Sequence, residues 1–343
     1  MGQGKQYVAG IVHFGADPGL EACLASLRTQ SRRPVQVVVV DHDPCEPGDE
    51  RRAALALAYP EVEWIHAPNG GYSAGANRLI ELSLSRVPEL DFILLMNPDV
   101  ELEPEFAATL LDELRGRPDV ALASGKLLRP GARTIDSAGI EMRRSRRFHD
   151  RGSEEPDDGR YGEVETVFAL SGAALMLRRA ALPSLALDGE VFDEDFFTYH
   201  EDTDLAWRAG KLGWRCLYVP AARAIHVRGW RRGERHRVVG AIRRHSWKNR
   251  YLELLKNESP LAFLRDLPFI LPLELARLGF ALLVDRTLLG AYLEAARQAR
   301  GALRKRALLG RSLLAARAHA GAMRPENRVA PRIPDLTGLP GRN

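Results

Sequence analysis

The stretch Phe192–Arg208 reads FDEDFFTYHEDTDLAWR and places acidic and aromatic side chains together. A solvated acidic tail would lack the aromatic residues, and a buried core segment would lack the carboxylates, because an unpaired buried charge is costly. The combination is typical of the wall of a polar cleft. From Glu201 to Leu212 the pattern predicts a helix with acidic residues in its first turn. We expect Glu201 and Asp202 to project into the cleft; the plain alternative is an ordinary capped helix after an acidic loop.

Upstream of this stretch, strands and helices alternate along the chain. Continuous apolar runs predict buried strands, and amphipathic segments between them predict helices. Such alternation indicates an α/β fold with an open, mostly parallel central sheet flanked by helices. We predict strands at 7–13, 35–40, 62–67, 91–96 and 120–124, regular structure at 164–170 and 173–177, and helices at 18–30, 49–58 and from the loop 69–77 to about residue 85. After the acidic helix we predict one more strand, at 215–219.

The ends of three predicted strands bring polar groups to one rim of this sheet. Asp41 and Asp99 each follow a predicted strand, and the glycine-rich loop 69–77 (NGGYSAGAN) follows the strand between them. Ligands of open α/β sheets bind beyond the carboxyl ends of the strands, and glycines let backbone approach a ligand closely. The loop matches neither the GxGxxG dinucleotide fingerprint nor a P-loop. Together the three strand ends predict a ligand site at this rim.

The composition is that of a folded protein in a reducing compartment. Hydrophobic residues make up 45% and charged residues 27% of the 343 residues, both ordinary for a globular protein. The three cysteines are odd in number and lack metal-site spacing, which argues against a disulfide framework. The N-terminal residues show no signal-peptide pattern. We therefore expect a cytoplasmic protein.

Charge is distributed unevenly along the chain. Residues 205–343 contain 28 Lys or Arg and 9 Asp or Glu, a net charge of +19, whereas residues 1–204 contain 21 and 36, a net charge of −15. This polarity indicates that the C-terminal part faces a polyanion, either an anionic membrane or nucleic acid. The alternative is a solvated basic surface. Because the stacking motifs of nucleic-acid modules are absent, we expect no nucleic-acid partner.

We predict a catalytic domain at 1–230, a basic amphipathic helical region at 231–322 and a disordered tail at 323–343. The apolar run 261–284 is interrupted by charged residues and prolines, so it is too polar for a clean transmembrane helix. The pattern favours helices lying peripherally on the anionic cytoplasmic face of the inner membrane. An equal alternative is that these helices pack on the core or form a homo-oligomer. Since every rim motif precedes Lys256, we expect a chain ending there to stay folded.

Two further segments complete the expectation. Residues 129–162 are polar and irregular in sequence, which predicts a mobile loop or lid. Pro220 should end the strand at 215–219, and His226 follows where the chain should return beside the rim.

The order and spacing of these motifs resemble the inverting glycosyltransferases of family two, which have the GT-A fold, and especially their rhamnosyltransferase-like branch. The resemblance spans about residues 7–230. The matching segments are VVVVD (37–41), NGGYSAGAN (69–77), LLMNPDV (94–100), SGAALMLRR (171–179), FDEDFFTYHEDTDLAWR (192–208), LYVP (217–220) and AIH (224–226).

This resemblance implies a metal-assisted transfer, with inversion, of a sugar from a nucleotide-sugar donor to a saccharide or polyprenyl-linked acceptor, the best match being rhamnose from dTDP-rhamnose. It implies that Asp99, the remaining acid of a DxD motif, binds Mg²⁺ or Mn²⁺ together with His226, and that Asp202 is the general base. A divalent ion neutralises the leaving diphosphate, and one carboxylate suffices to take the acceptor's proton. It assigns donor binding to Asp41, Asn69, Gly71, Tyr72, Gly75, Asn77, Asn97 and Asp99, and the acceptor side to Glu201, Asp204 and Trp207.

The sequence departs from the family pattern at several positions. Asn97 stands where the DxD motif has its first carboxylate, which leaves a weaker metal site. Residues 42–49 (HDPCEPGD) and 13–15 (HFG) also differ from the usual nucleotide pocket. These departures leave the donor open, with UDP-galactofuranose, UDP-glucose and GDP-mannose as alternatives. A nucleotide-sugar binder without catalysis is disfavoured because Asp99, Asp202 and His226 are all present.

Overall fold

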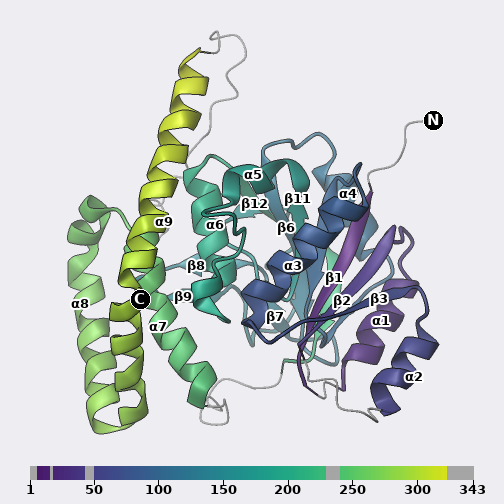
Figure 1. The fold of residues 1–343 in the computed structure, drawn as a ribbon, viewed down its shortest axis with the longest axis horizontal. Coiled ribbons are helices and arrows are strands. Elements are labelled where there is room, and N and C mark those ends of the chain that lie inside the picture. The colour runs from purple at the N-terminus through teal and green to yellow at the C-terminus, as the bar shows by residue number, and fades with distance from the viewer. Residues whose placement is uncertain (1–5, 16–17, 43–49, 229–239, 323–343) are drawn as a thin grey trace.

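The computed structural model describes residues 6–15, 18–42, 50–228 and 240–322. Within this part of the chain, a central sheet carries helices on both faces, and a group of long helices stands at one side (Figure 1). The strands are β1 (Tyr7–His13), β2 (Gln36–Asp41), β3 (Val62–His66), β4 (Phe92–Met96), β5 (Val100–Leu102), β6 (Val120–Leu128), β7 (Ile135–Ser137), β8 (Ile140–Met142), β9 (Phe148–Asp150), β10 (Glu165–Val167), β11 (Ala174–Arg178) and β12 (Arg215–His226).

The first half of the sheet is parallel, as the sequence predicts. The described strands pair in the order β10-β12-β6-β11-β4-β1-β2-β3, and β1 to β4 run parallel. Both faces of these strands are buried: along β4, Phe92 and Leu94 join one apolar cluster, while Ile93 and Leu95 join the other. The apolar runs therefore form central strands because each side chain meets a helix layer, whichever face it points to.

Different helices cover the two faces of the sheet. Buried residues of α1, α2 and α4 join the first cluster, and those of α3, α5 and α6 join the second, which lies on the side of the acidic segment. The helices are α1 (Leu20–Arg28), α2 (Glu50–Ala58), α3 (Gly71–Arg86), α4 (Phe106–Leu114), α5 (Leu182–Leu185), α6 (Glu201–Lys211), α7 (Gly240–Asn257), α8 (Pro260–Leu283) and α9 (Leu289–Ala322), with short 3₁₀ turns η1 (Arg179–Ala181), η2 (Glu194–Phe196) and η4 (Arg286–Leu288).

Strand β12 differs from the prediction because it continues past Pro220. It runs parallel to β6, but Val219 and Arg223 pair with the consecutive residues Gly125 and Lys126. The three residues between them form a bulge, and the proline, which has no N–H to donate, sits inside it. The bulge lets the strand resume and carry its last residues to the rim.

The prediction of an irregular segment at 129–162 was wrong in part. Strand β7 pairs with β6, and β8 pairs with β9 in a separate two-stranded sheet. Arg146, in the turn between β8 and β9, is buried and ion-paired to Glu258 and Asp266 of the C-terminal part. The positive charges that made this segment look solvated are used in contacts distant in sequence.

The C-terminal part is helical in its described residues, as predicted. Helix α8 begins at a capped end, where the Ser259 hydroxyl accepts a hydrogen bond from the Ala262 N–H at 3.1 Å, and it contains Pro268 and Pro272. In the described chain no single helix has the length and apolar character to cross a membrane; α8 passes that test only together with residues 286–314, at a bend of 116°. The predicted boundary near 230 and the predicted tail at 323–343 lie outside the described residues.

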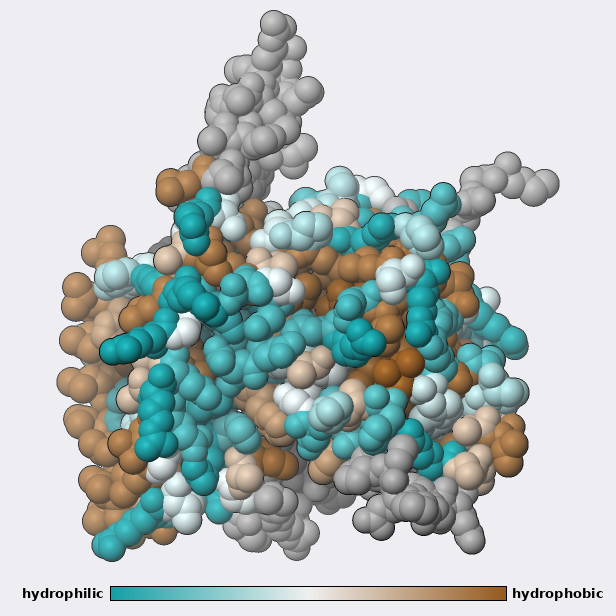
Figure 2. All heavy atoms as spheres, in the orientation of Figure 1, coloured by the Kyte–Doolittle hydropathy of each residue, from teal (hydrophilic) through white to brown (hydrophobic). Residues whose placement is uncertain are grey.

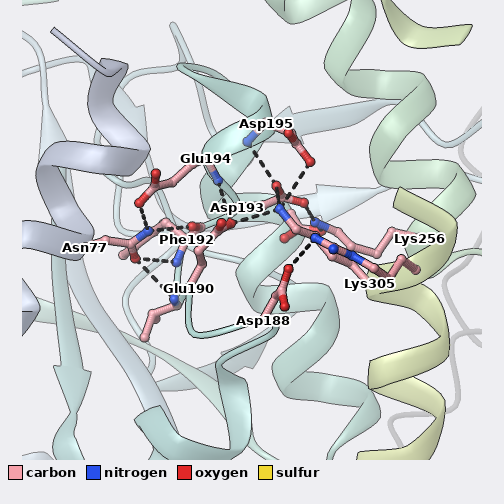
Figure 3. A network of polar contacts seen from close by, with 12 residues as sticks. Asn77, Asp188, Glu190, Phe192, Asp193, Glu194, Asp195, Lys256 and Lys305 are labelled. Carbon is pink, nitrogen blue, oxygen red and sulfur yellow. Dashed lines mark hydrogen bonds and ion pairs between the residues drawn. The ribbon is translucent and has the colours of Figure 1, made fainter. Parts of the chain in front are cut away.

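Buried ion pairs join these helices to the acidic segment. Lys256 of α7 and Lys305 of α9 both contact the Asp193 carboxylate, and Lys305 also lies 2.8 Å from Glu190 and 3.2 Å from Asp195 (Figure 3). Burial opposes ionisation of Asp193, but the two lysines outweigh it and lower its pKa. Part of the charge polarity predicted to face a polyanion is therefore neutralised within the chain.

Candidate functional site

The glycine-rich loop forms the N-terminus of α3, where close packing requires glycine. The Asn69 Oδ1 accepts a hydrogen bond from the Gly71 N–H at 3.0 Å, and Gly71 has a φ of +83°. A Cβ at Gly71 would lie 2.3 Å from the carbonyl oxygen of Phe197, which itself accepts a hydrogen bond from the Ser73 N–H at 3.2 Å. The loop thus lies directly against the acidic segment.

The other loop residues have mainly structural contacts in this state. A Cβ at Gly75 would come within 2.6 Å of Val12, so this glycine lets α3 approach β1. The Tyr72 hydroxyl donates to the Gly172 carbonyl at 3.3 Å, and its ring meets Phe192 edge-on at 6.2 Å. The contact with Phe192 ties the loop to the segment that carries Asp202, and the contact with Gly172 ties it to the residue whose N–H bonds the Asp202 carboxylate.

Asn77 has different partners from those we predicted. Its Oδ1 accepts from the N–H groups of Val191 and Phe192 at 3.1 and 2.9 Å. Its Nδ2 donates to the Phe192 carbonyl at 2.8 Å and to Glu194 at 2.9 Å (Figure 3). The amide therefore holds α3 to the start of the acidic segment, and a contact with donor stays a prediction.

Asp41 lies at the end of β2 and is 1% exposed. Its Oδ1 is 3.0 Å from His13 Nδ1, and its Oδ2 is 3.2 Å from a guanidinium nitrogen of Arg52. His13 is the residue that departs from the family pattern. The charge of Asp41 is thus balanced by the chain, and its predicted contact with a nucleotide base is untested.

Asp99 and His226 come together, as predicted, through the pairing of β5 with β12. Val100 pairs with His226, which puts the preceding Asp99 beside the imidazole, with 3.5 Å between Asp99 Oδ1 and His226 Nε2. Asn97 is fixed by its backbone, since its N–H donates to the Ala173 carbonyl at 2.8 Å. The strand ends thus bring a carboxylate oxygen and an imidazole nitrogen to one point of the rim.

Asp136 is a further member of this site that the sequence analysis missed. Its Oδ2 lies 2.7 Å from His226 Nδ1, and its other oxygen contacts Arg129 at 2.7 Å and Arg228 at 3.3 Å. Burial opposes protonation of His226, but the hydrogen bonds to Asp136 and Asp99 outweigh it and raise the pKa of His226 to about 9. No local motif marks Asp136, because it lies in β7 within the segment predicted to be irregular.

The oxygen and nitrogen atoms at this point of the rim fit a weakly held divalent ion. A carboxylate that accepts from Nδ1 orients an imidazole so that Nε2 faces a metal, which is the usual arrangement around metal-ligating histidines. Mg²⁺ and Mn²⁺ are commonly held by one or two protein groups together with substrate phosphates. In the described residues, no three His, Cys, Asp or Glu side chains form a complete metal site. Asp99 and His226 would therefore need donor phosphates to complete the coordination.

Asp202 lies in the first turn of α6, as predicted. Its Oδ2 accepts from the Gly172 N–H at 3.1 Å, and its Oδ1 accepts from the Thr203 N–H at 2.7 Å. Burial raises the pKa of Asp202, which these two backbone hydrogen bonds oppose and the charge of Asp150 reinforces. A carboxylate with a raised pKa at a helix N-terminus has the properties of a general base.

A chain of charged groups connects Asp202 to the metal-ligand pair. Asp150, whose charge acts on Asp202, lies 3.2 Å from Arg228. Arg228 in turn contacts Asp136, the partner of His226. The candidate base and the candidate metal ligands are therefore linked electrostatically through Asp150 and Arg228.

The three predicted acceptor-side residues have different environments. Glu201 is buried beside Asp202, and burial followed by the charge of Asp202 raises its pKa well above the usual value. Asp204 is fully buried and contacts Arg208 at 3.0 Å, Lys256 at 2.9 Å and Asn257 at 2.6 Å. These contacts use the Asp204 carboxylate within α6 and between α6 and α7, and an acceptor contact by Asp204 stays a prediction.

Trp207 is half-buried in an aromatic cluster. Its ring lies edge-on to Phe148 at 6.2 Å and to Phe168 at 6.0 Å, while Phe148 also meets His200 at 5.8 Å. The cluster packs β9 and residue 168 against α6. An acceptor contact by Trp207 stays a prediction.

A cavity of about 730 Å³ lies elsewhere, between α3 and the segment 178–191. Its lining in the described chain is largely apolar, including Ile80, Leu84 and Leu182, and it shares only Asn77 with the predicted site residues. Asp99, Asp202 and His226, whose pKa values are all shifted, do not line this cavity, so we place the site at the rim.

Comparison with known proteins identifies the family of this chain. Residues 9–181 match the family described as Glycosyl transferase family 2. The chain belongs to glycosyl transferase family 2. This family-2 chain is 31% identical over 237 residues to an N-acetylglucosaminyl-diphospho-decaprenol L-rhamnosyltransferase of Mycobacterium tuberculosis, a match covering 63% of this chain and 74% of the relative. The predicted family is confirmed, and the protein is a transferase that uses a sugar donor.

Solved glycosyltransferase structures confirm the predicted GT-A fold. GalNAc-T7 with UDP, GalNAc and Mn²⁺ has a TM-score of 0.55 at 14% identity, covering 73% of this chain. Staphylococcus aureus TarS has a TM-score of 0.52 at 16% identity over 91% of this chain, and the family-2 chain spans 48% and 53% of these two proteins. The Pyrobaculum calidifontis mannosyltransferase PcManGT, in complex with GDP-Man and Mn²⁺, has a TM-score of 0.51 at 17% identity over 92% of this chain and 87% of its own.

Proposed function

We propose that this family-2 enzyme transfers rhamnose from dTDP-rhamnose to a polyprenyl-linked saccharide, with inversion at the anomeric carbon. The observation that carries the proposal is the Asp202 carboxylate, which has a raised pKa at the start of α6, in a chain that also places Asp99 beside His226. One carboxylate suits a single displacement, whereas a covalent intermediate would need a second carboxylate as nucleophile. The similarity to a rhamnosyltransferase that acts on a decaprenol-linked sugar supports this choice of donor and acceptor.

Each group of the site has a task in this proposal. Asp202, held by the Gly172 and Thr203 N–H groups, accepts the proton of the acceptor hydroxyl. Asp99 and His226 would hold Mg²⁺ or Mn²⁺, and a bound ion would supply positive charge against the leaving diphosphate. The N-terminus of α3 contributes the positive end of its helix dipole to an anionic donor, while its Gly71 and Ser73 N–H groups hold the loop to Asn69 and Phe197.

Other donors remain alternatives to dTDP-rhamnose. UDP-galactofuranose, UDP-glucose and GDP-mannose need the same base and metal ligands, and the pairing of His13 with Asp41 does not favour one nucleotide over another. A nucleic-acid-binding function is weakened by the burial of Lys256 and Lys305, because buried lysines cannot contact phosphates.

We also propose that the enzyme lies on the cytoplasmic face of the inner membrane, docked through α8. In the described chain α8 buries only Asp266, Ile270 and Ala281, and its apolar side chains form a continuous band along one edge of the molecule (Figure 2). The large exposed apolar residues of α8 and the residue after it are Leu261, Leu264, Phe269, Leu271, Leu275, Leu278, Phe280, Leu282, Leu283 and Val284.

An anionic bilayer matches this surface better than bulk water does. A band of this kind rarely stays exposed in a soluble monomer. Arg144 and Arg265 lie beside it, each with more than half of its side chain exposed, and they can approach anionic headgroups while the apolar residues enter the interface. Docking there would place the enzyme where a polyprenyl-linked acceptor resides.

The donor is tested by a screen of nucleotide-sugars in the presence of Mn²⁺. Thermal stabilisation should be greatest with dTDP-rhamnose, and mass spectrometry should detect one added deoxyhexose on an N-acetylglucosaminyl-diphospho-polyprenol acceptor. Stabilisation and transfer by UDP- or GDP-sugars alone would replace the donor assignment while leaving the family unchanged.

A further inference from the structure

The residues just before α6 have a backbone conformation that side chains rarely adopt. Phe197, Tyr199 and His200 have φ values of 66°, 68° and 71°, and none of them is glycine. A residue in this region is held there only when its surroundings impose it. The turn 196–200 ends two residues before Asp202, so whatever holds the turn also affects the candidate base.

One side chain of α7 contacts three backbone carbonyls of this turn. Asn249 is fully buried, and its Nδ2 lies 2.8 Å from the carbonyl oxygens of Phe196 and Thr198 and 2.7 Å from that of Tyr199. Carbonyl groups that a turn leaves without backbone partners are costly to bury. The two hydrogens of this amide group are shared among the three carbonyl oxygens, and that of Phe196 also accepts a hydrogen bond from the Thr198 N–H at 2.8 Å.

Two neighbours of Asn249 on the same face of α7 contact the turn as well. The His245 ring stacks on Phe197 with centroids 4.7 Å apart, and the Glu253 carboxylate lies 2.6 Å from His200 Nδ1. Residues 245, 249 and 253 are spaced four apart, so they form one stripe along the helix. This polar stripe faces the turn rather than solvent.

The opposite side of the turn contacts the glycine-rich loop 69–77, here called the donor loop, and helix α6, which carries Asp202. The Phe197 carbonyl accepts from the Ser73 N–H at 3.2 Å and leaves no room for a Cβ at Gly71. The His200 carbonyl accepts from the Asp204 N–H at 2.9 Å, which is an early hydrogen bond of α6. The turn is thus the physical connection between the N-terminus of α3 and the N-terminus of α6.

We propose that Asn249 is a positioning residue for transfer: through the turn 196–200, α7 fixes where Asp202 stands relative to the donor loop. The inference rests on the proposed function only in taking Asp202 as the base. It makes α7 part of the catalytic unit, although it lies outside the segment that matches the family and contributes no group to the reaction itself.

The sharpest test is Asn249→Asp, which keeps the size of the side chain but replaces the hydrogen-bonding amide group by a carboxylate that faces three carbonyl oxygens. Asn249→Leu removes the hydrogen-bond donor without adding a charge. The matched control is Tyr251→Phe, because the Tyr251 hydroxyl bonds Glu274 of α8 at 2.6 Å on another face of α7. Displacements of about 1 Å can lower a rate by about a hundredfold. We expect kcat to fall by at least about thirtyfold in Asn249→Asp and by less in Asn249→Leu, with the KM for dTDP-rhamnose changed by less than about threefold.

Hydrogen exchange provides a readout that needs no substrate. Amides of residues 197–204 should exchange at least about tenfold faster in Asn249→Asp, whereas amides of β1 and β4 and all amides of Tyr251→Phe should match wild type. If wild type does not use dTDP-rhamnose, the donor assignment fails and exchange still decides the inference. If Asn249→Asp does not fold, His245→Ala, which removes only the ring on Phe197, should show a smaller change of the same kind. Folded variants with wild-type exchange at 197–204, or with a kcat within about twofold of wild type, would overturn it.

Discussion

Replacing Lys305 by Met tests whether buried ion pairs hold the C-terminal helices against the acidic residues 190–195. The Lys305 Nζ lies 2.5 Å from Asp193, 2.8 Å from Glu190 and 3.2 Å from Asp195, and only 4% of its side chain is exposed. Methionine keeps the apolar stem and removes the charge. Because Asp193 retains its contact with Lys256, it loses only part of its compensation.

The expected loss follows from these contacts. Removing one partner of a buried ion pair typically costs about 3–5 kcal/mol, and the remaining lysine places this case at the lower end, about 3 kcal/mol. An unfolding entropy of about 2.1 cal/mol/K per residue gives about 0.7 kcal/mol/K for a chain of this length. The melting temperature of Lys305→Met should therefore fall by about 4 °C.

The assay is urea and thermal unfolding followed by circular dichroism, with Arg304→Met as the control. Arg304 pairs with Asp188 across the same interface, but 64% of its side chain is exposed, so its loss should cost less than about 0.5 kcal/mol. If Lys305→Met also stays within about 0.5 kcal/mol of wild type, the buried pairs do not hold the helices and the reasoning is refuted.

Four further outcomes are expected. Asp202→Asn should lower transfer by at least about a hundredfold while calorimetric affinity for dTDP-rhamnose stays within about threefold, and near-normal turnover would remove Asp202 from the mechanism. EDTA should abolish transfer and Mn²⁺ or Mg²⁺ restore it, and Asp136→Asn should raise the Mn²⁺ concentration for half-maximal activity by about 10- to 100-fold; full activity in EDTA would contradict this. The full-length protein should cosediment with anionic vesicles, less so at high salt, and Leu264→Glu with Leu275→Glu should abolish binding; if analytical ultracentrifugation instead shows a dimer that these substitutions dissociate, α8 is a subunit interface. The pKa of Asp193 in the folded protein is below its ordinary value of 3.8, so its contribution to stability is complete above that value and is lost as the pH falls below about 4. Urea unfolding from pH 6 to 3 should therefore show that the free energy of unfolding declines less steeply with falling pH in Asp193→Asn than in wild type. Identical slopes of the free energy against pH would exclude this contribution.

The parallel half of the sheet and its rim could be predicted because their signals are local. A fully buried strand needs a continuous apolar run, so β2 and β4 are visible in sequence, and polar residues just beyond such runs mark the carboxyl edge. Asp99 and His226 lie together for this reason. The helix that carries Asp202 was likewise marked by the acidic residues in its first turn.

Contacts between distant segments could not be predicted in the same way. Asp136 and Asp204 look alike in sequence, yet one orients an imidazole and the other pairs with lysine and arginine inside the protein. The C-terminal charge was read as a surface property, although Lys256 and Lys305 neutralise the acidic segment. A chain ending at Lys256 would remove Lys305 from Asp193, so we now expect it to be destabilised rather than to fold unchanged.

The bulge of β12 makes chain length at this point a determinant of the site. Its three extra residues fold over Gly125, where a Cβ would lie 1.9 Å from the Ala222 carbonyl oxygen. Side chains alternate between the faces of a strand, so adding or deleting one residue here would turn His226 away from Asp99 without altering either residue. A change in the number of residues, or a methyl group at Gly125, could thus disable the metal-ligand pair while every candidate ligand is still present in the sequence.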